Sequence, residues 1–129
     1  GASSPELDEN IAASFSNYGA QIVDLFAPGV SIISLDTNNT YSMSDGTSVA
    51  AQVATGIAAL ILSYYPDLKP NQLISLLKES SYKVIQPKKV LTPNEEGKKR
   101  KIKFSKLSKS GGIINAYNAF LAAEKLTKN

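Results

Sequence analysis

The sequence contains no cysteine and no histidine among its 129 residues. Without cysteine there is neither a disulfide framework nor a thiolate metal site, although this does not fix the cellular compartment. Without histidine the chain lacks the commonest general base and the commonest metal ligand. Residue 1 is glycine, and no basic segment followed by an apolar run comes after it. We therefore expect any targeting information to lie upstream of Gly1.

Composition is otherwise that of an ordinary folded domain, with 43% hydrophobic and 19% charged residues. Ten of the 14 Lys and Arg residues, against two of the 11 Asp and Glu residues, lie between Lys83 and Lys109, giving this segment +8 and the remainder −5. It has no sustained periodicity, contains Pro87 and Pro93, and offers few apolar side chains. We predict a mobile basic surface insertion over residues 83–110, which trypsin should cut first.

The run Lys98-Lys99-Arg100-Lys101 is also typical of nucleic-acid-binding segments. Only Phe104 stands near it as a stacking residue, and no nucleic-acid-binding module is recognisable. We therefore expect a solvated loop and no nucleic-acid partner. An anionic-polymer-binding module through Lys83–Lys109 remains an alternative, and steeply salt-dependent DNA binding would support it.

Periodicity and turn signals divide the rest of the chain into short elements. We expect a surface loop over residues 1–10, strands over Gln21–Phe26 and Val30–Leu35, a brief extended segment over Tyr41–Ser44, and helices over Val49–Leu62, from Pro70 onward and over Asn115–Leu126. The inward positions expected are Leu73, Ile74, Leu76 and Leu77 in the second helix, and Ala116, Phe120, Ala123 and Leu126 in the third.

The helix expected over Val49–Leu62 is apolar on every side, which is typical of a helix in the middle of a protein. Polar and small residues interrupt it at Gln52, Thr55, Gly56 and Ser63, so we expect no membrane span. Its second side needs a partner, and the chain alone should expose an apolar patch or bury it by self-association.

A serine at the start of this helix is the residue best placed for chemistry. In Asp45-Gly46-Thr47-Ser48, Gly46 lets the backbone approach a ligand closely and the turn presents the Ser48 hydroxyl outward. The helix N-terminus supplies unpaired N–H groups where an oxyanion would form if Ser48 attacked a carbonyl. The alternative is structural, because Thr47 or Ser48 could simply cap a core helix.

Five segments in order resemble the subtilase family of serine peptidases. The turn is similar to the family's Gly-Thr-Ser-x-Ala-x-Pro-x-Val-x-Gly signature, with Gly46, Thr47, Ser48, Ala50 and Gly56 in register. The other four are Ala13-Ser14-Phe15-Ser16-Asn17-Tyr18-Gly19, Val23-Asp24-Leu25-Phe26-Ala27-Pro28-Gly29-Val30, Ala58-Ala59-Leu60-Ile61-Leu62-Ser63 and Gly111-Gly112-Ile113-Ile114-Asn115-Ala116. Gly1-Ala2-Ser3-Ser4 also resembles the end of a preceding family strand.

The resemblance implies an α/β, subtilisin-like three-layer fold with a parallel sheet. Residues 1–129 would be its C-terminal part, comprising the last strands, the central nucleophile helix and two C-terminal helices. It implies a serine endopeptidase that hydrolyses peptide bonds through an acyl-enzyme on Ser48. Gly46 and Thr47 would position the nucleophile, and the Ser48 backbone N–H would form half of the oxyanion hole.

The same resemblance implies that the family's Asp, His and oxyanion Asn, which precede the serine in subtilases, would lie before Gly1. Because a serine hydroxyl needs a neighbouring base, we predict that this chain alone is inactive. Lys69, Lys78, Lys125 and Lys128 have no spacing that argues for a Ser–Lys pair.

Two positions depart from the family signature. Gln52 replaces a proline of the signature, and Ala54 replaces a valine. We expect position 52 in the first helical turn, where a proline loses no hydrogen bond. Gln52 is the sequence feature that favours the alternative of a catalytically dead pseudoprotease or regulatory fragment.

Partners and location also follow from the resemblance alone. It implies a protein or peptide substrate, contact with the remainder of the catalytic domain N-terminal to Gly1, and a secreted or cell-envelope location. Calcium is common in the family, but no acidic cluster here resembles a site, so we expect no cofactor or metal on this chain.

Overall fold

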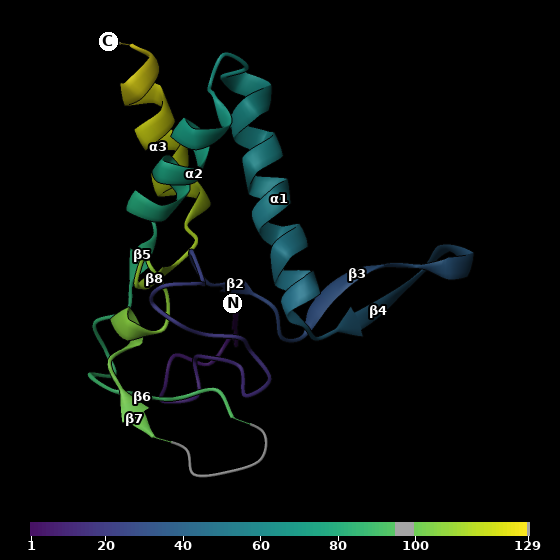
Figure 1. Ribbon diagram of the computed structural model, residues 1–129. Coiled ribbons are helices and arrows are strands. Elements are labelled where there is room, and N and C mark those ends of the chain that lie inside the picture. The colour runs from purple at the N-terminus through teal and green to yellow at the C-terminus, as the bar shows by residue number, and fades with distance from the viewer. Residues whose placement is uncertain (95–99, 129) are drawn as a thin grey trace.

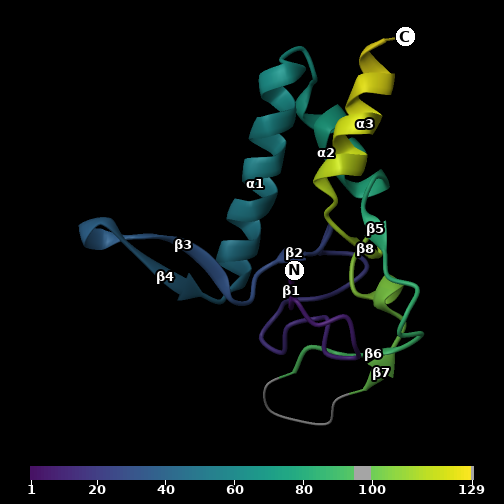
Figure 2. The same cartoon turned by 180° about the vertical axis from the view of Figure 1, so that it is seen from behind.

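The computed structural model describes residues 1–94 and 100–128. Helices α1, α2 and α3 gather at one end of the molecule and most of the short strands at the other (Figure 1). The view from behind shows the same division, with one β-hairpin projecting sideways beyond the base of α1 (Figure 2). The sequence predictions made for residues 95–99, which include Lys98 and Lys99, lie outside the described residues.

A pair of parallel strands joins the start of the chain to the segment before the hairpin. β1 (Ala2–Ser3) and β2 (Ala27–Pro28) pair with Ala2 opposite Ala27. Both alanines are almost fully buried and contribute to the same core cluster as α1 residues. Small side chains are required because a Cβ at Gly29 would lie 2.8 Å from that of Ala2.

Two sequence predictions are wrong in this region. The opening residues were expected to form a surface loop, yet Ala2 and Ser3 form a buried strand, as the family resemblance implied. The strand expected over Gln21–Phe26 instead occupies Ala27–Pro28, while Ile22 is 75% exposed. The prediction followed the high β-propensity of residues 21–26. The strand forms one step later, at Ala27–Pro28, because the close approach to β1 requires small side chains there.

The projecting hairpin separates its apolar and polar side chains. β3 (Ile32–Asp36) and β4 (Thr40–Ser44) are antiparallel, near the two extended segments predicted, and the intervening 3₁₀ turn is η1 (Thr37–Asn39). The pairs Ile33–Met43 and Leu35–Tyr41 lie on one face because cross-strand partners share a side of the pleat. These four side chains are 64–72% exposed, so the face is uncovered in this chain.

Helix α1 (Thr47–Tyr64) packs along one side only. Ala50 and Ile61 are buried, with Ala54 and Ile57 packed partly against the same core cluster. The prediction of a helix over Val49–Leu62 is confirmed, and its second side lacks a partner among the described residues, as expected for this chain. The mean hydropathy of α1 is 1.4 over its 18 residues, so by length and composition alone the helix could cross a membrane. Core helices of soluble proteins also meet this criterion.

The two shorter helices complete the first core. α2 (Pro70–Glu79) begins with its proline, as predicted, and the Lys69 backbone N–H donates to Gln72 Oε1 at 2.9 Å. Leu73, Leu76 and Leu77 are buried, whereas Ile74 is exposed, contrary to the prediction.

α3 (Ala116–Thr127) is capped by Asn115, whose Oδ1 accepts from the Asn118 N–H at 2.9 Å. Ala119 and Ala123 are buried in α3, and Phe120 packs against the Tyr64 and Tyr65 rings. The predicted inward positions Ala116 and Leu126 are exposed.

The described part of the basic segment is folded rather than loose. β5 (Tyr82–Lys83) pairs with β8 (Gly112–Ile113), and β6 (Val90–Leu91) pairs with β7 (Lys101–Ile102), both antiparallel. A second core cluster is formed by the buried side chains of Ile11, Ala12, Phe26, Val90, Phe104 and Leu107. The segment offers few apolar side chains, as the sequence indicates, and three of them, Val90, Phe104 and Leu107, are buried in this cluster and anchor it.

Lys83 links the segment that follows α2 to the turn before β8 through hydrogen bonds. Its Nζ donates to Ser81 Oγ at 2.9 Å and to the Ser110 carbonyl at 2.7 Å. A basic residue expected to be solvated thus joins two segments that are 27 residues apart.

Candidate functional site

Ser48 is the second residue of α1 and is exposed at its N-terminal end. Thr47 is the first helical residue, and Gly46 is the N-cap. The turn lies where β4 runs into α1 and beside β2, at the base of the helix (Figure 1). All three residues predicted for the site are therefore adjacent at one exposed corner.

The backbone at Gly46 fixes this corner. Its φ of +154° and ψ of 157° fall in a region that is essentially restricted to glycine. A Cβ built there would lie 3.1 Å from Ser48 Oγ. The Gly46 N–H donates to the Gly29 carbonyl at 2.8 Å, which docks the turn onto the end of β2.

A second tie holds the hairpin to the same turn. Asp45 Oδ1 accepts from the Ser31 backbone N–H at 2.6 Å, across the open end of β3 and β4. Sequence reasoning missed the roles of Asp45 and Gly29. For Asp45 the signal was present, because an Asp beside a Gly commonly accepts a backbone hydrogen bond in a turn.

The N-terminus of α1 has no side-chain cap. Gly46 has no side chain with which to accept a hydrogen bond, and the first turn contains no acidic residue. The first helical backbone bond runs from the Ala50 N–H to the Gly46 carbonyl at 3.1 Å. The N–H groups before Ala50, including that of Ser48, therefore remain available to an anion.

This geometry overturns the structural alternative for the turn. Neither Thr47 nor Ser48 occupies the cap position, and among the described residues neither hydroxyl accepts a capping hydrogen bond from a backbone N–H of the first turn. Because the Ser48 hydroxyl does not cap the helix, it is available to contact a ligand.

No base accompanies that hydroxyl in the part of the chain that the structure describes. Ser48 Oγ makes no hydrogen bond to any of these residues, and none of the described lysines contacts it. Since a serine hydroxyl is a weak nucleophile until a neighbouring group accepts its proton, the site on this chain is incomplete. It offers an exposed hydroxyl and backbone N–H donors only.

The side of α1 that bears Ser48 is the side left uncovered. Gln52, Thr55, Ala59 and Ser63 follow Ser48 at helical spacing, and all are exposed. Their side chains are small or polar, so a body packed here would approach the helix closely. Groups that complete the site would have to reach Ser48 from this direction.

Gln52 also requires a correction. It was expected in the first helical turn, but α1 begins at Thr47, so Gln52 is the sixth helical residue. At this position a helical N–H donates to the carbonyl four residues earlier, here that of Ser48. Gln52 therefore retains a backbone hydrogen bond that the proline of the family signature would remove.

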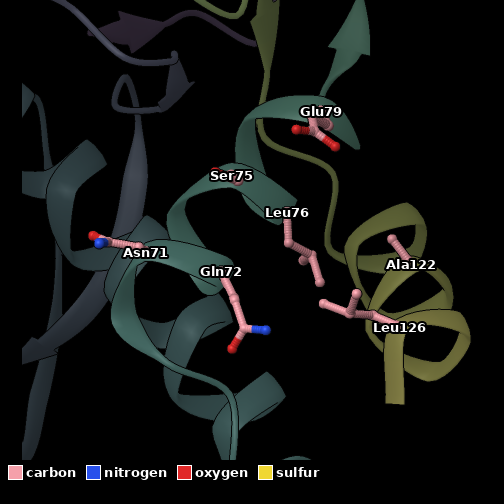
Figure 3. A pocket seen from close by; sticks show the side chains of 7 residues that line it. All are labelled: Asn71, Gln72, Ser75, Leu76, Glu79, Ala122 and Leu126. Atoms are coloured by element: carbon pink, nitrogen blue, oxygen red, sulfur yellow. The ribbon is translucent and has the colours of Figure 1, made fainter. Parts of the chain in front are cut away.

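A small hollow of about 100 Å³ lies beside the first turns of α1 and is lined in part by Thr47, Ala50 and Ala51. Other hollows are lined by elements away from the serine. Figure 3 shows one of about 440 Å³ between α2 and α3, lined by Asn71, Gln72, Ser75, Leu76, Glu79, Ala122 and Leu126. Glu79 is the one ionisable group there, so the hollow has no acid–base pair. Within residues 1–94 and 100–128, no three acidic side chains come together to hold a metal ion.

Comparison with known proteins places the chain in a large group. The subtilase family matches residues 3–111. Over 103 residues the chain is 39% identical to subtilisin-like protease 3 of Plasmodium falciparum, covering 80% of this chain and 11% of that protein. It is 41% identical over 96 residues to the serine protease AprX of Bacillus subtilis, covering 59% of this chain and 22% of that protein.

Solved structures share the same fold. A structure reported for the assembly of subtilase cytotoxin SubAB superposes with a TM-score of 0.65 at 25% identity, covering 84% of this chain and 29% of the other. The prenylagaramide maturation protease PagA superposes with a TM-score of 0.63 at 22% identity, covering 95% of this chain and 41% of the other. The fold is thus the α/β subtilisin-like fold, of which this chain is a part.

The chain spans between about a tenth and a quarter of the length of the curated relatives it matches. The match nevertheless covers most of the chain, and it includes the Gly46-Thr47-Ser48 turn and the whole of α1. The chain therefore belongs to the subtilase family of serine proteases.

Proposed function

We propose that this chain is the C-terminal part of a catalytic domain in a subtilisin-type serine endopeptidase, in which Ser48 is the nucleophile. The observation that carries the proposal is the pairing of an exposed, unbonded Ser48 hydroxyl with an uncapped helix N-terminus. The two are arranged for attack on a carbonyl and for binding of the resulting oxyanion.

In the proposed reaction, Ser48 Oγ attacks the carbonyl carbon of the scissile peptide bond and forms a tetrahedral intermediate. The Ser48 backbone N–H donates to the oxyanion as half of the oxyanion hole, with Gly46 and Thr47 holding the turn. Collapse of the intermediate expels the amine and leaves an acyl-enzyme on Ser48, which water then hydrolyses.

The general base, its orienting carboxylate and the second oxyanion donor would come from residues outside this chain. Two observations support this. The sequence has no histidine, and the face of α1 that bears Ser48 is uncovered. We propose that the remainder of the catalytic domain packs on that face, which makes α1 a core helix of a soluble domain rather than a membrane span.

The location of the full-length protein belongs to the same proposal. One relative, 48% identical over 67 residues, is named the extracellular serine proteinase of a Thermus species. We infer a secreted or cell-envelope protein, with proteins or peptides as substrates. Fractionation of the producing cells, followed by detection of the full-length protein, tests the inference.

Substitution of Ser48 tests the proposed role directly. In the full-length protein, Ser48→Ala should lower peptidase kcat by at least about 10⁴-fold. Stability should change by less than about 0.5 kcal/mol, because the hydroxyl is needed only for covalent attack. A fluorophosphonate probe should label the wild type and not the variant, as read by mass spectrometry of the Ser48 peptide.

Ser63→Ala is the matched control, because Ser63 lies on the same face of α1 at its other end and should keep full activity. The isolated 129-residue chain should remain unlabelled, since it has no base. Labelling of the isolated chain would contradict the need for an external base. A full-length wild type that the probe does not label would instead support the pseudoprotease that Gln52 suggests.

A further inference from the structure

Four lysines surround one hollow on the side of the molecule remote from Ser48. The hollow measures about 300 Å³ and is lined by Lys89, Lys101, Ile102, Lys103 and Lys106. Lys101 and Ile102 form β7, and Lys106 ends the 3₁₀ turn η2 (Phe104–Lys106). Lys89 directly precedes β6, and Lys103 lies between β7 and η2. In both overall views the β6–β7 pair lies at the opposite side of the molecule from the projecting hairpin (Figures 1 and 2).

The lysines converge because the residues between them are anchored. Val90 is fully buried beside Lys89, and Phe104 and Leu107 are buried on either side of Lys106. The apolar side chains enter the second core cluster, so the intervening lysines are directed outward around its edge. The hollow therefore rests on a packed support and keeps its shape.

Within the described residues, one of the four lysines around the hollow forms an ion pair. Lys101 Nζ lies 2.5 Å from Glu9 Oε2. Lys89, Lys103 and Lys106 form no ion pair with any carboxylate in residues 1–94 and 100–128. Three unpaired ammonium groups around one hollow repel each other, and a ligand with several negative charges would relieve that repulsion.

The surroundings favour an acidic polypeptide over a nucleic acid. The aromatic ring nearest in sequence, Phe104, is 2% exposed and packs edge-on against Phe26 at 5.1 Å, so it cannot stack on a base. The lining contains no arginine, the side chain best suited to bind phosphate through two hydrogen bonds.

The strand beside the hollow offers a further feature suited to a peptide. Among the described strands β7 pairs only with β6, so its other edge is open. An extended peptide can add to an open strand edge through main-chain hydrogen bonds. Half-buried Ile102 gives the hollow an apolar floor beneath the charges.

We propose that this lysine hollow is a docking site for an Asp/Glu-rich polypeptide segment of a substrate or partner protein. The segment binds in extended form along β7 and places its carboxylates against Lys89, Lys103 and Lys106. The proposal does not depend on Ser48, because binding at this site requires no peptide-bond cleavage.

Binding of fluorescein-labelled poly-glutamate to the full-length protein tests the proposal. Ser48→Ala is present in every sample so that no probe is cleaved, and the readout is fluorescence anisotropy. The triple variant Lys89→Gln, Lys103→Gln, Lys106→Gln should raise the Kd about tenfold, the effect of three surface ion pairs. Affinity for the unsubstituted protein should fall between about 50 mM and about 200 mM salt.

The triple variant Lys69→Gln, Lys125→Gln, Lys128→Gln removes the same net charge from α2 and α3 and should bind as tightly as the unsubstituted protein. Equal loss in both triple variants would overturn the site, because net charge alone would then explain binding. Unchanged binding in the first variant, with a melting temperature that shows it is folded, would also overturn it. So would a DNA oligonucleotide that binds more tightly than the acidic peptide.

Discussion

Gly46 lies directly against the Ser48 hydroxyl, in a backbone conformation that is essentially restricted to glycine. Its positive φ turns the chain into α1, its N–H is held by the Gly29 carbonyl, and its missing Cβ leaves space next to Ser48 Oγ. A side chain here would strain the backbone by about 1–3 kcal/mol and would press on the nucleophile. We therefore expect Gly46 to have both a structural role and a positional role.

Gly46→Ala in the full-length protein should therefore lower kcat/KM about 100-fold, since small misplacements of a reacting group cost about that much. Gly19→Ala is the matched control. Gly19 has a similar φ of +150°, but its added Cβ would meet Ile22 rather than the serine. Both variants should melt at lower temperature, and only Gly46→Ala should lose activity per folded molecule. Equal activity loss in the two would refute a positional role for Gly46.

At the scale of elements, the basic segment shows how a few apolar residues organise a charged stretch. Phe104 lies in edge contact with Phe26, and Val90 and Leu107 complete the cluster with Ile11. These contacts join residues more than 70 positions apart in the chain. The lysines between them are exposed because their neighbours are buried.

Phe104→Ala should therefore destabilise the full-length protein by about 3–5 kcal/mol, the usual range for loss of a buried phenylalanine. Trypsin should then cut faster after Lys101, Lys103 and Lys106, as peptide mapping would show. Ile85→Ala removes an apolar side chain that is 75% exposed, and it should change stability by less than about 0.5 kcal/mol. If Phe104→Ala melted and digested like Ile85→Ala, the second core cluster would be disproved.

On the scale of the whole molecule, two surfaces are left uncovered in this chain. One is the exposed face of α1, and the other is the apolar face of the β3–β4 hairpin, which carries Ile33, Leu35, Tyr41 and Met43. In the proposed full-length protein the rest of the domain would cover α1. The 129-residue chain alone has only other copies of itself with which to cover these surfaces.

The isolated chain should therefore self-associate and bind a hydrophobic dye, whereas the full-length protein should do so far less. Sedimentation velocity measures the first property and dye fluorescence the second. Replacing Ile33 and Met43 with lysine should shift the isolated chain toward monomer, because the two residues pair on the apolar face. A monodisperse isolated chain that binds no dye would show that 129 residues close their own core.

The family, the helices and the position of the Gly46-Thr47-Ser48 turn at a helix start could be predicted from the sequence, because each depends on local spacing. The hairpin follows from two extended runs around Asp36–Asn39, and α1 from an unbroken apolar stretch that begins after glycine. The Gly46-Thr47-Ser48 turn was recognised because its residue types are dictated by backbone geometry within a few positions. Backbone geometry of this kind is determined by residues that are consecutive in the chain.

Tertiary structure alone decided which residues are close packed and which face remains open. The sequence prediction placed this strand at residues 21–26 instead of Ala27–Pro28. The small side chains of Ala27–Pro28 are required by contact with distant residues, which β-propensity does not report. The buried roles of Val90 and Phe104, and the lysine hollow that they support, depend on contacts with Ile11 and Phe26. Spacing along the chain does not encode such pairings, since burial is determined by what the fold brings into contact.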